Sequence, residues 1–371
     1  MAPAAAAPLT VLGDDLLQEV FIRLPAPADL LRAAAACKPF LGAVRCARFL
    51  RRFRRRHAST FPPLLGCLVL RCNRGHLHHQ EPNPARLLTP SAAARRVADR
   101  GDFALSFLPH RTCYCGAMWQ VLDCRNSRLL LSTWVSRQLM VADPLTRHWV
   151  SLPMLPSLSF VGYGLVADHG DSSVFQVVCI SREGASLRVF LLSSGEHRWD
   201  EVARFANQSN FACTRAMQAN KSLYWKLEGG ERMVAFNTLG MEFFVIDLPP
   251  VLRFDIIEKG EEDDGGIYIL TMRDFYIETW VGVKTNTGSR AWKLLEKSVR
   301  FRRVLHGGWQ DIIGVVAGVL FLRHHAGLVS IDLDTMRLRR LPEREDGPLG
   351  QIYPYTMAWP PSCLNPTEQG A

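Results

Sequence analysis

The sequence predicts an α+β multidomain chain, in which an N-terminal domain of three helices precedes an all-β propeller, taken to have six blades. Two observations support this prediction. Residues 9–57 space their apolar side chains as helices do, whereas residues 64–360 show short apolar strands separated by turn residues. The second region also repeats itself, and strand-built repeats of 40 to 50 residues are typical of propellers. Residues 1–8 and 361–371 are expected to be disordered tails.

The first predicted helix carries an apolar stripe that recurs every four residues, formed by Leu12, Leu16, Val20 and Leu24. Asp14 and Asp15 stand near its start, where carboxylates suit the helix dipole. Pro25 and Pro27 end this helix, and Pro27 can open the next one because a proline in the first turn sacrifices no hydrogen bond.

Two more helices are expected before residue 57. One runs through Leu30, Leu31 and the alanine run 33–36 towards Cys37. The other is predicted from Phe40 to about Arg56. Three short helices are marginal as an independent domain, so part of their apolar surface is expected to be buried against a partner.

Residues 12–44, LGDDLLQEVFIRLPAPADLLRAAAACKPFLGAV, resemble an F-box. The matching positions are Leu12, Asp14, Asp15, Leu16, Leu17, Val20, Leu24, Pro25, Asp29, Leu30, Leu31, Cys37, Lys38 and Phe40. The sequence departs from the family pattern where Gly13 replaces the usual proline and where Phe40 stands in place of a common tryptophan. Neither departure removes an apolar contact.

The resemblance implies that these helices dock on a Skp-type linker protein and, through it, on a cullin of an SCF-type ubiquitin ligase. Docking would then be of the helix-in-groove kind. The expected docking residues are Leu12, Asp15, Leu16, Val20, Leu24, Pro25, Leu30, Leu31, Cys37 and Phe40. The alternative is that the helices are only a cap on the β domain.

The repeat in the β region is a strand that contains an aromatic or large apolar residue and that ends close to Leu-Pro or a similar pair of residues. The equivalent positions are taken as Trp149, Trp199, Phe243, Trp292 and Leu338, which lie 50, 44, 49 and 46 residues apart. One more step back lands near Phe103. Before each of three copies, a pair of strands ends near Asp143, Asn237 or Asp332.

Six copies of about 47 residues fill residues 64–360, and a strand at 352–359 is expected to pair with the first blade and close the ring. The phrase at Asp143–Pro153, DPLTRHWVSLP, resembles the F-box-associated propellers of large plant families. That resemblance implies a domain that holds a target protein, but no target-binding residue can be named. A two-sheet β-sandwich is the alternative fold.

The apolar runs, the N-terminal residues and the cysteines indicate in which cellular compartment the protein is expected. The longest apolar run, 312–322, is too short to span a membrane and contains two glycines, and residues 1–8 lack the pattern of a signal peptide. The ten cysteines are scattered without the spacing of a disulfide framework. We therefore expect a soluble protein of the cytoplasm and/or nucleus with reduced thiols and no membrane partner.

No motif of an enzyme is present in the sequence, and neither a cofactor nor a metal ion is expected. The strongest metal candidate is His110, Cys113, Cys115 and Cys124, whose spacing is poor for zinc. Much of the net charge of +9 comes from arginines between residues 45 and 56, which fit the exposed face of a helix. Nucleic acid is therefore not the expected partner, although an RNA- or ligand-binding propeller without a ligase role remains the alternative function, with a propeller hydrolase as a further rival.

Overall fold

The computed structural model describes most of the chain, and the statements below concern these residues. They are 12–57, 64–71, 86–89, 92–109, 119–133, 138–155, 159–167, 174–206, 209–212, 215–219, 221–251, 253–257, 266–273, 276–284, 290–297, 309–324, 327–341, 349–361 and 364. The tail predicted at 1–8 lies outside them. Within the tail predicted at 361–371, Leu364 is described and is buried.

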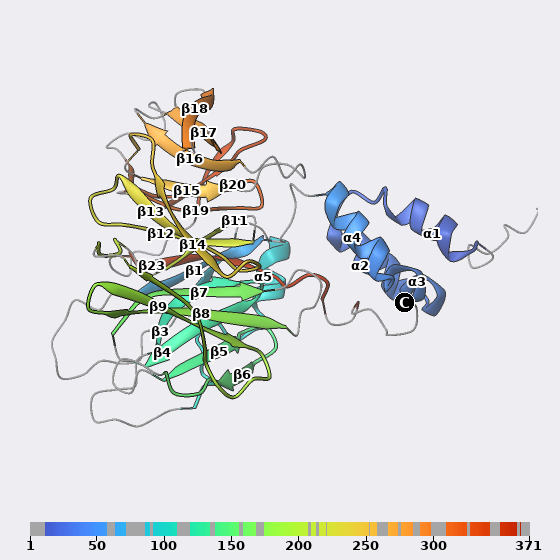
Figure 1. The fold of residues 1–371 in the computed structure, drawn as a ribbon. Coiled ribbons are helices and arrows are strands. Elements are labelled where there is room, and N and C mark those ends of the chain that lie inside the picture. The colour runs from blue at the N-terminus through green and yellow to red at the C-terminus, as the bar shows by residue number, and fades with distance from the viewer. Residues whose placement is uncertain are drawn as a thin grey trace, which may run out of the picture.

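Four helices form the N-terminal domain, which lies beside the stacked sheets in Figure 1. They are α1 (Asp14–Phe21), α2 (Pro27–Ala36), α3 (Lys38–Val44) and α4 (Ala47–Arg56). The third predicted helix is thus two helices, because the chain becomes extended at Cys46 (φ −62°, ψ 119°). A fifth helix, α5 (Ala92–Ala98), lies outside this domain and contacts β1 of the propeller.

The remainder is a propeller of six sheets. Blade 1 holds β1 (Leu64–Arg71), β2 (Arg86–Leu88) and β23 (Leu349–Thr356). Blade 2 holds β3 (Trp119–Arg125), β4 (Arg128–Thr133), β5 (Leu139–Asp143) and β6 (His148–Ser151). Blade 3 holds β7 (Phe160–Ala167), β8 (Phe175–Glu183), β9 (Ser186–Ser193) and β10 (Asp200–Ala206).

The other three blades each have four antiparallel strands. Blade 4 holds β11 (Met217–Ala219), β12 (Ser222–Lys226), β13 (Arg232–Asn237) and β14 (Glu242–Asp247). Blade 5 holds β15 (Phe254–Ile257), β16 (Ile267–Arg273), β17 (Tyr276–Lys284) and β18 (Arg290–Lys297). Blade 6 holds β19 (Trp309–Val316), β20 (Val319–His324), β21 (Gly327–Asp332) and β22 (Leu338–Arg340).

The two ends of the β region close the ring. β23 pairs with β1 in an antiparallel register, with Leu68 opposite Tyr353, so blade 1 takes its innermost strand from the C-terminal end. β23 also contacts the inner strands β3 and β19 of the neighbouring blades. The predicted closure is confirmed, although the strand ends at Thr356 and does not reach residue 359.

The five repeat positions found in the sequence lie in, or directly before, the fourth strand of blades 2 to 6. Trp149, Phe243, Trp292 and Leu338 lie in β6, β14, β18 and β22, and Trp199 directly precedes β10. Phe103 lies in no strand; it packs edge-on to Tyr355, their ring centroids 5.0 Å apart. Apolar side chains between neighbouring blades are buried in separate clusters, so each blade is stabilised by the blades beside it.

Candidate functional site

Helix α1 has two apolar faces. Leu17 and Phe21 are buried in the core of the helical domain, with 2% and 5% of their surface exposed. Leu16 and Val20, one position earlier in each case, are 58% and 51% exposed. Because residues four apart lie on the same side of a helix, Leu16 and Val20 form one uncovered apolar surface, which we call the α1 outer face.

The other predicted docking residues surround the α1 outer face to different degrees. Asp15 and Pro25 are exposed, and Cys37 is half-buried. Partly buried residues pack against the domain core, namely Leu12, Leu24, Leu31 and Phe40, with the Phe40 ring edge-on to Phe21 at 5.2 Å. Leu30 is fully buried, so it supports the helices from inside. The residues expected to dock therefore include both surface and core side chains.

Helix α4 separates its aromatic and basic residues as the sequence predicted. Phe49, Leu50 and Phe53 are buried, whereas arginines cover the opposite side. Arg52 pairs with Glu19 of α1 at 2.5 Å, and this pairing raises the pKa of Arg52 and lowers the pKa of Glu19. Both side chains are about half exposed, so the pair orients the two helices more than it stabilises them.

The core of the helical domain also contains two residues from the far end of the chain. Trp359 and Leu364 are 7% and 1% exposed and belong to the same cluster as Phe49 and Phe53. The Trp359 ring stacks on Phe53 with their centroids 6.2 Å apart. Nothing in the sequence pattern around residue 359 pointed to this contact, because the two rings are separated by about 300 positions.

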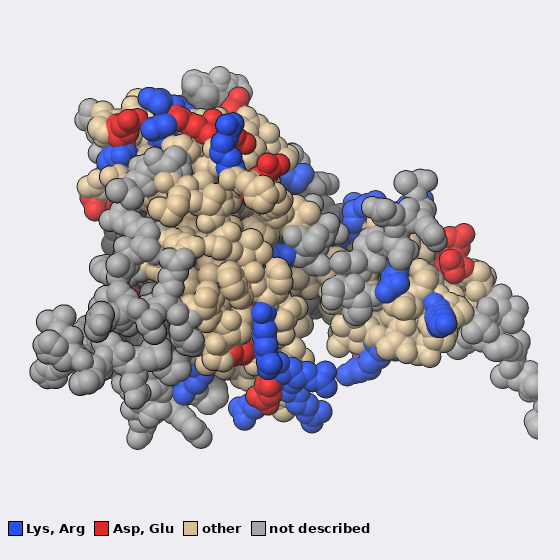
Figure 2. Space-filling model, turned by 90° about the horizontal axis from the view of Figure 1, so that it is seen from below, with Lys and Arg blue, Asp and Glu red and all other residues tan. Residues whose placement is uncertain are grey.

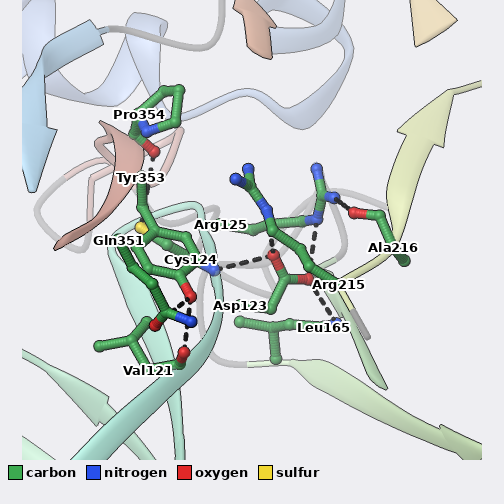
Figure 3. A network of polar contacts seen from close by, with 10 residues as sticks. All are labelled: Val121, Asp123, Cys124, Arg125, Leu165, Arg215, Ala216, Gln351, Tyr353 and Pro354. Atoms are coloured by element: carbon green, nitrogen blue, oxygen red, sulfur yellow. Dashed lines mark hydrogen bonds and ion pairs between the residues drawn. The ribbon is translucent and has the colours of Figure 1, made fainter. Parts of the chain in front are cut away.

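A polar network ties the inner strands together near the propeller axis (Figure 3). Asp123, which is fully buried, accepts hydrogen bonds from the backbone N–H groups of Cys124 and Leu165, both at 2.9 Å. The Nε atoms of Arg125 and Arg215 lie 3.2 and 3.5 Å from its two oxygens. Three hydrogen bonds and the ion pair with Arg215 therefore occupy both oxygens of this carboxylate, and it is poorly placed to serve as a general base.

Arg215 is held from two sides. Its guanidinium lies 4.9 Å from the centre of the Tyr353 ring, and Asp123 is on its other side. Burial by itself would lower the pKa of Arg215, but the negative charges of Asp123 and Asp255 and the nearby Tyr353 raise it. This arginine is charged at every physiological pH, so it is a structural cation.

Asp255 repeats the role of Asp123 three blades further on. Its Oδ2 accepts the N–H of Val315 in blade 6 at 2.7 Å, just as Asp123 accepts the N–H of Leu165 in blade 3. In both cases an inner-strand aspartate binds the inner strand of the next blade. These acids are therefore explained by the packing of the propeller.

The metal candidate is only partly described, since His110, Cys113 and Cys115 lie outside the described residues. Cys124 is buried, its thiol donates to the carbonyl oxygen of Pro354 at 3.5 Å, and burial raises its pKa to about 12. A thiol that stays protonated is a poor metal ligand. Among the residues that the structure describes, no three histidine, cysteine or acidic side chains form a metal-binding group.

A shallow cleft of about 290 Å³ opens between blades 2 and 3. Its apolar lining includes Val150, Leu152 and Phe175, and Glu196 and His197 stand beside them. Val150 is 40% exposed, and nearby Met154 is 72% exposed. The cleft is smaller than typical cofactor sites.

Charged side chains are unevenly spread on the face seen in Figure 2. On the propeller, lysines, arginines and acids gather towards the top and the bottom of the view, with a broad band of mostly other residues between them, and the helical domain at the right carries further charged side chains. Positive and negative groups are interleaved in the propeller, for example where Glu201 bonds Arg188 and Arg204. Within the described residues, no helix is long and apolar enough to cross a membrane.

Solved structures similar to this chain include several propeller-containing proteins. An oligogalacturonate lyase in complex with manganese is 12% identical, with a TM-score of 0.35 over 59% of this chain and 62% of that one. The WD40 domain of SCAP from fission yeast is 14% identical, with a TM-score of 0.36 over 68% of this chain and 59% of that one. A luciferin-regenerating enzyme is 8% identical, with a TM-score of 0.36 over 61% of this chain and 78% of that one. Likeness at this level does not extend to function.

The chain thus spans about 62% of the length of the first of these structures. A comparison with curated proteins found no match to this chain. A family model does match, and it covers residues 120–362, well over half of the chain. Its description is "F-box protein AT5G49610-like, beta-propeller". With four helices that carry an F-box-like sequence ahead of a six-bladed propeller, the chain belongs to this family of F-box proteins.

Proposed function

We propose that this protein is the substrate-recognition adaptor of an SCF-type cullin-RING ubiquitin ligase. The α1 outer face would dock on a Skp-type linker, and the propeller would hold a target protein. The chain would then act by bringing target lysines close to a ubiquitin-charged partner enzyme, and it would perform no bond chemistry itself.

The observation that carries this proposal is the exposure of Leu16 and Val20. Their helix is already anchored by Leu17 and Phe21, so folding does not need these two side chains to be apolar. Exposed apolar side chains on an amphipathic helix are typical anchors for a partner's groove. Asp15 and Pro25 are exposed and could contact the same partner at its rim.

The test is a double substitution, Leu16→Asp with Val20→Asp, assayed against a purified Skp-type linker by calorimetry. Each buried side chain of this size contributes about 1.5 to 3 kcal/mol, so we expect affinity to fall at least about 100-fold. Val20 is chosen over Leu24 because Leu24 packs on the domain core and its substitution would disturb folding.

The matched control is Leu239→Asp, which places the same charge at a leucine that is 69% exposed on the propeller. This variant should bind the linker as the unmodified protein does. Undiminished binding by the double variant, with an unchanged circular dichroism spectrum, would rule out docking through the α1 outer face.

The rival function, RNA binding, has one supporting observation in the arginine side of α4. Such binding would weaken steeply with salt, because it would depend on the charges of the arginines. Linker binding through apolar contacts would change little between 50 mM and about 200 mM salt. The salt dependence of binding therefore separates the two functions.

A further inference from the structure

The two cores of the molecule meet within three consecutive residues. Met357 packs on the apolar cluster shared by blades 1 and 2, which contains Leu68 and Tyr355. Trp359 packs in the core of the helical domain. A single residue, Ala358, stands between a side chain that belongs to the propeller and one that belongs to the helices.

The propeller side of this junction is firmly held. The hydroxyl of Tyr355, which is fully buried, donates to the carbonyl oxygen of Ser127 at 2.9 Å. The carbonyl oxygen of Thr356 accepts the N–H of Ser127, and the Thr356 hydroxyl oxygen accepts the N–H of Asn126. The backbone is therefore fixed to blade 2 as far as Thr356.

The helical side is held as well. Trp359 stacks on Phe53, which in turn lies against the ring of His57 at 4.4 Å. The Nε2 atom of His57 is 3.2 Å from the carbonyl oxygen of Ile22 at the end of α1. Leu364 is buried in the same core. Contacts from Trp359 thus reach from α4 to the end of α1.

Chain geometry turns these contacts into a rigid joint. The Cα atoms of two residues that are two positions apart lie at most about 7 Å from each other. The connection from Met357 to Trp359 therefore keeps the propeller core and the helical core close together. The other covalent connection, residues 58–63, is six residues long and could span about 20 Å if extended. By length alone, that connection would allow many orientations.

We propose that Trp359 and Leu364 complete the core of the F-box domain and that Trp359 fixes the orientation of this domain on the propeller. Trp359 is thus a positioning residue: it sets where a target on the propeller stands relative to a linker on the α1 outer face. The structural half of this proposal is independent of the proposed function, and only its consequence for ubiquitin transfer rests on that function.

The first experiment asks whether Trp359 belongs to the helical core. Hydrogen exchange is compared in the full chain, in Trp359→Ala and in Trp359→Phe. Trp359→Ala should raise exchange of the amides in α1 and α4 at least about tenfold and leave the inner strands unchanged, and Trp359→Phe should restore most of the protection. Equal protection in all three proteins would overturn the proposal.

The second experiment separates positioning from core packing. Six residues of alternating glycine and serine are inserted after Ala358. The insertion keeps Trp359 and Leu364 in the chain but lengthens the connection between the propeller core and the helical core. Fluorophores are placed on unnatural amino acids at Arg48 and Leu239, both exposed, to measure the distance between the two domains. The insertion should leave α1 and α4 protected and broaden the distance distribution at least about twofold. A distribution as narrow as that of the unmodified chain would contradict the proposal.

The third measurement tests the consequence for the ligase. In a reconstituted complex, ubiquitin attached to the propeller's own lysines is mapped by mass spectrometry. A rigid joint should restrict modification to a few lysines, and the insertion should spread it over more of them. If the distances broaden but no ubiquitin is transferred by either protein, the joint is established and the proposed ligase function fails.

Discussion

At the level of single residues, Asp123 shows how a charged side chain is used inside this propeller. Its carboxylate, in blade 2, meets Leu165 of blade 3 and Arg215, which lies two residues before the first strand of blade 4. Arg125, also bound to Asp123, donates to the carbonyl oxygen of Ala216 at 2.8 Å. Arg215 in turn reaches Tyr353 of blade 1. One acid therefore joins four blades around the axis.

Asp123→Asn removes this charge while keeping the shape of the side chain. Two arginines, 21% and 24% exposed, would lose their counter-charge, and such losses in buried sites cost about 3 kcal/mol. We expect a fall of that size in the free energy of unfolding, measured with urea. Asp200→Asn is the control, because Asp200 is exposed and 3.7 Å from Arg198. It should change stability by no more than about 0.5 kcal/mol, and equal effects of the two substitutions would contradict this role for Asp123.

At the level of elements, local chemistry made the outer strands predictable. Asp143, Asn237 and Asp332 end the third strand of their blades, and each side chain accepts a backbone N–H two or three residues later. These Asx turns lead into the fourth strand, so an acid or amide at the end of an apolar strand is a signal that sequence alone carries. The same signal is weak in blade 1, where the described residues form three strands and one of these comes from the other end of the chain.

The division of α3 from α4 was harder to predict. Phe53 comes nine residues after Val44, and both side chains are fully buried. On one continuous helix with about 100° per residue, they would point about 180° apart. The break at Cys46 lets both face the same core. No proline or glycine marks this break, so only the three-dimensional packing reveals it.

Gly13 is an element-level departure from the F-box pattern that the structure allows to be tested. Its φ of −63° at the N-terminus of α1 matches the angle that proline prefers, and a Cβ there would meet nothing within 4 Å. Gly13→Pro should therefore stabilise the helix by about 0.5 to 1 kcal/mol, seen as two- to fivefold slower hydrogen exchange in α1. Gly195→Pro is the opposing control, since φ is +90° there and proline should destabilise the turn. Faster exchange in α1 of Gly13→Pro would show that the F-box start needs glycine.

At the scale of the whole molecule, contacts between residues far apart in the chain determine which side chains are buried, and the sequence pattern alone did not predict this. The expected docking residues do not all lie at the surface: Leu30 is in the core and Leu16 is outside it, because packing against the other helices decides which side of each helix is covered. Likewise, Trp359 was placed in the last strand of the propeller, whereas it fills the F-box core. Both differences depend on residues far away in the chain, where periodicity carries no information.

Ring closure is the last property of the whole molecule that can be tested. Deleting 349–371 removes β23, which pairs with β1 and contacts β3 and β19, so blades 2 and 6 would each lose their neighbour. Because every blade is stabilised by the next, the propeller should lose its single cooperative thermal transition. Deleting only 359–371 keeps β23 and should preserve that transition, although the helices lose Trp359 and Leu364. Calorimetry of both truncated proteins decides the matter: a cooperative transition after loss of 349–371 would mean that five blades are stable without closure by the C-terminal strand.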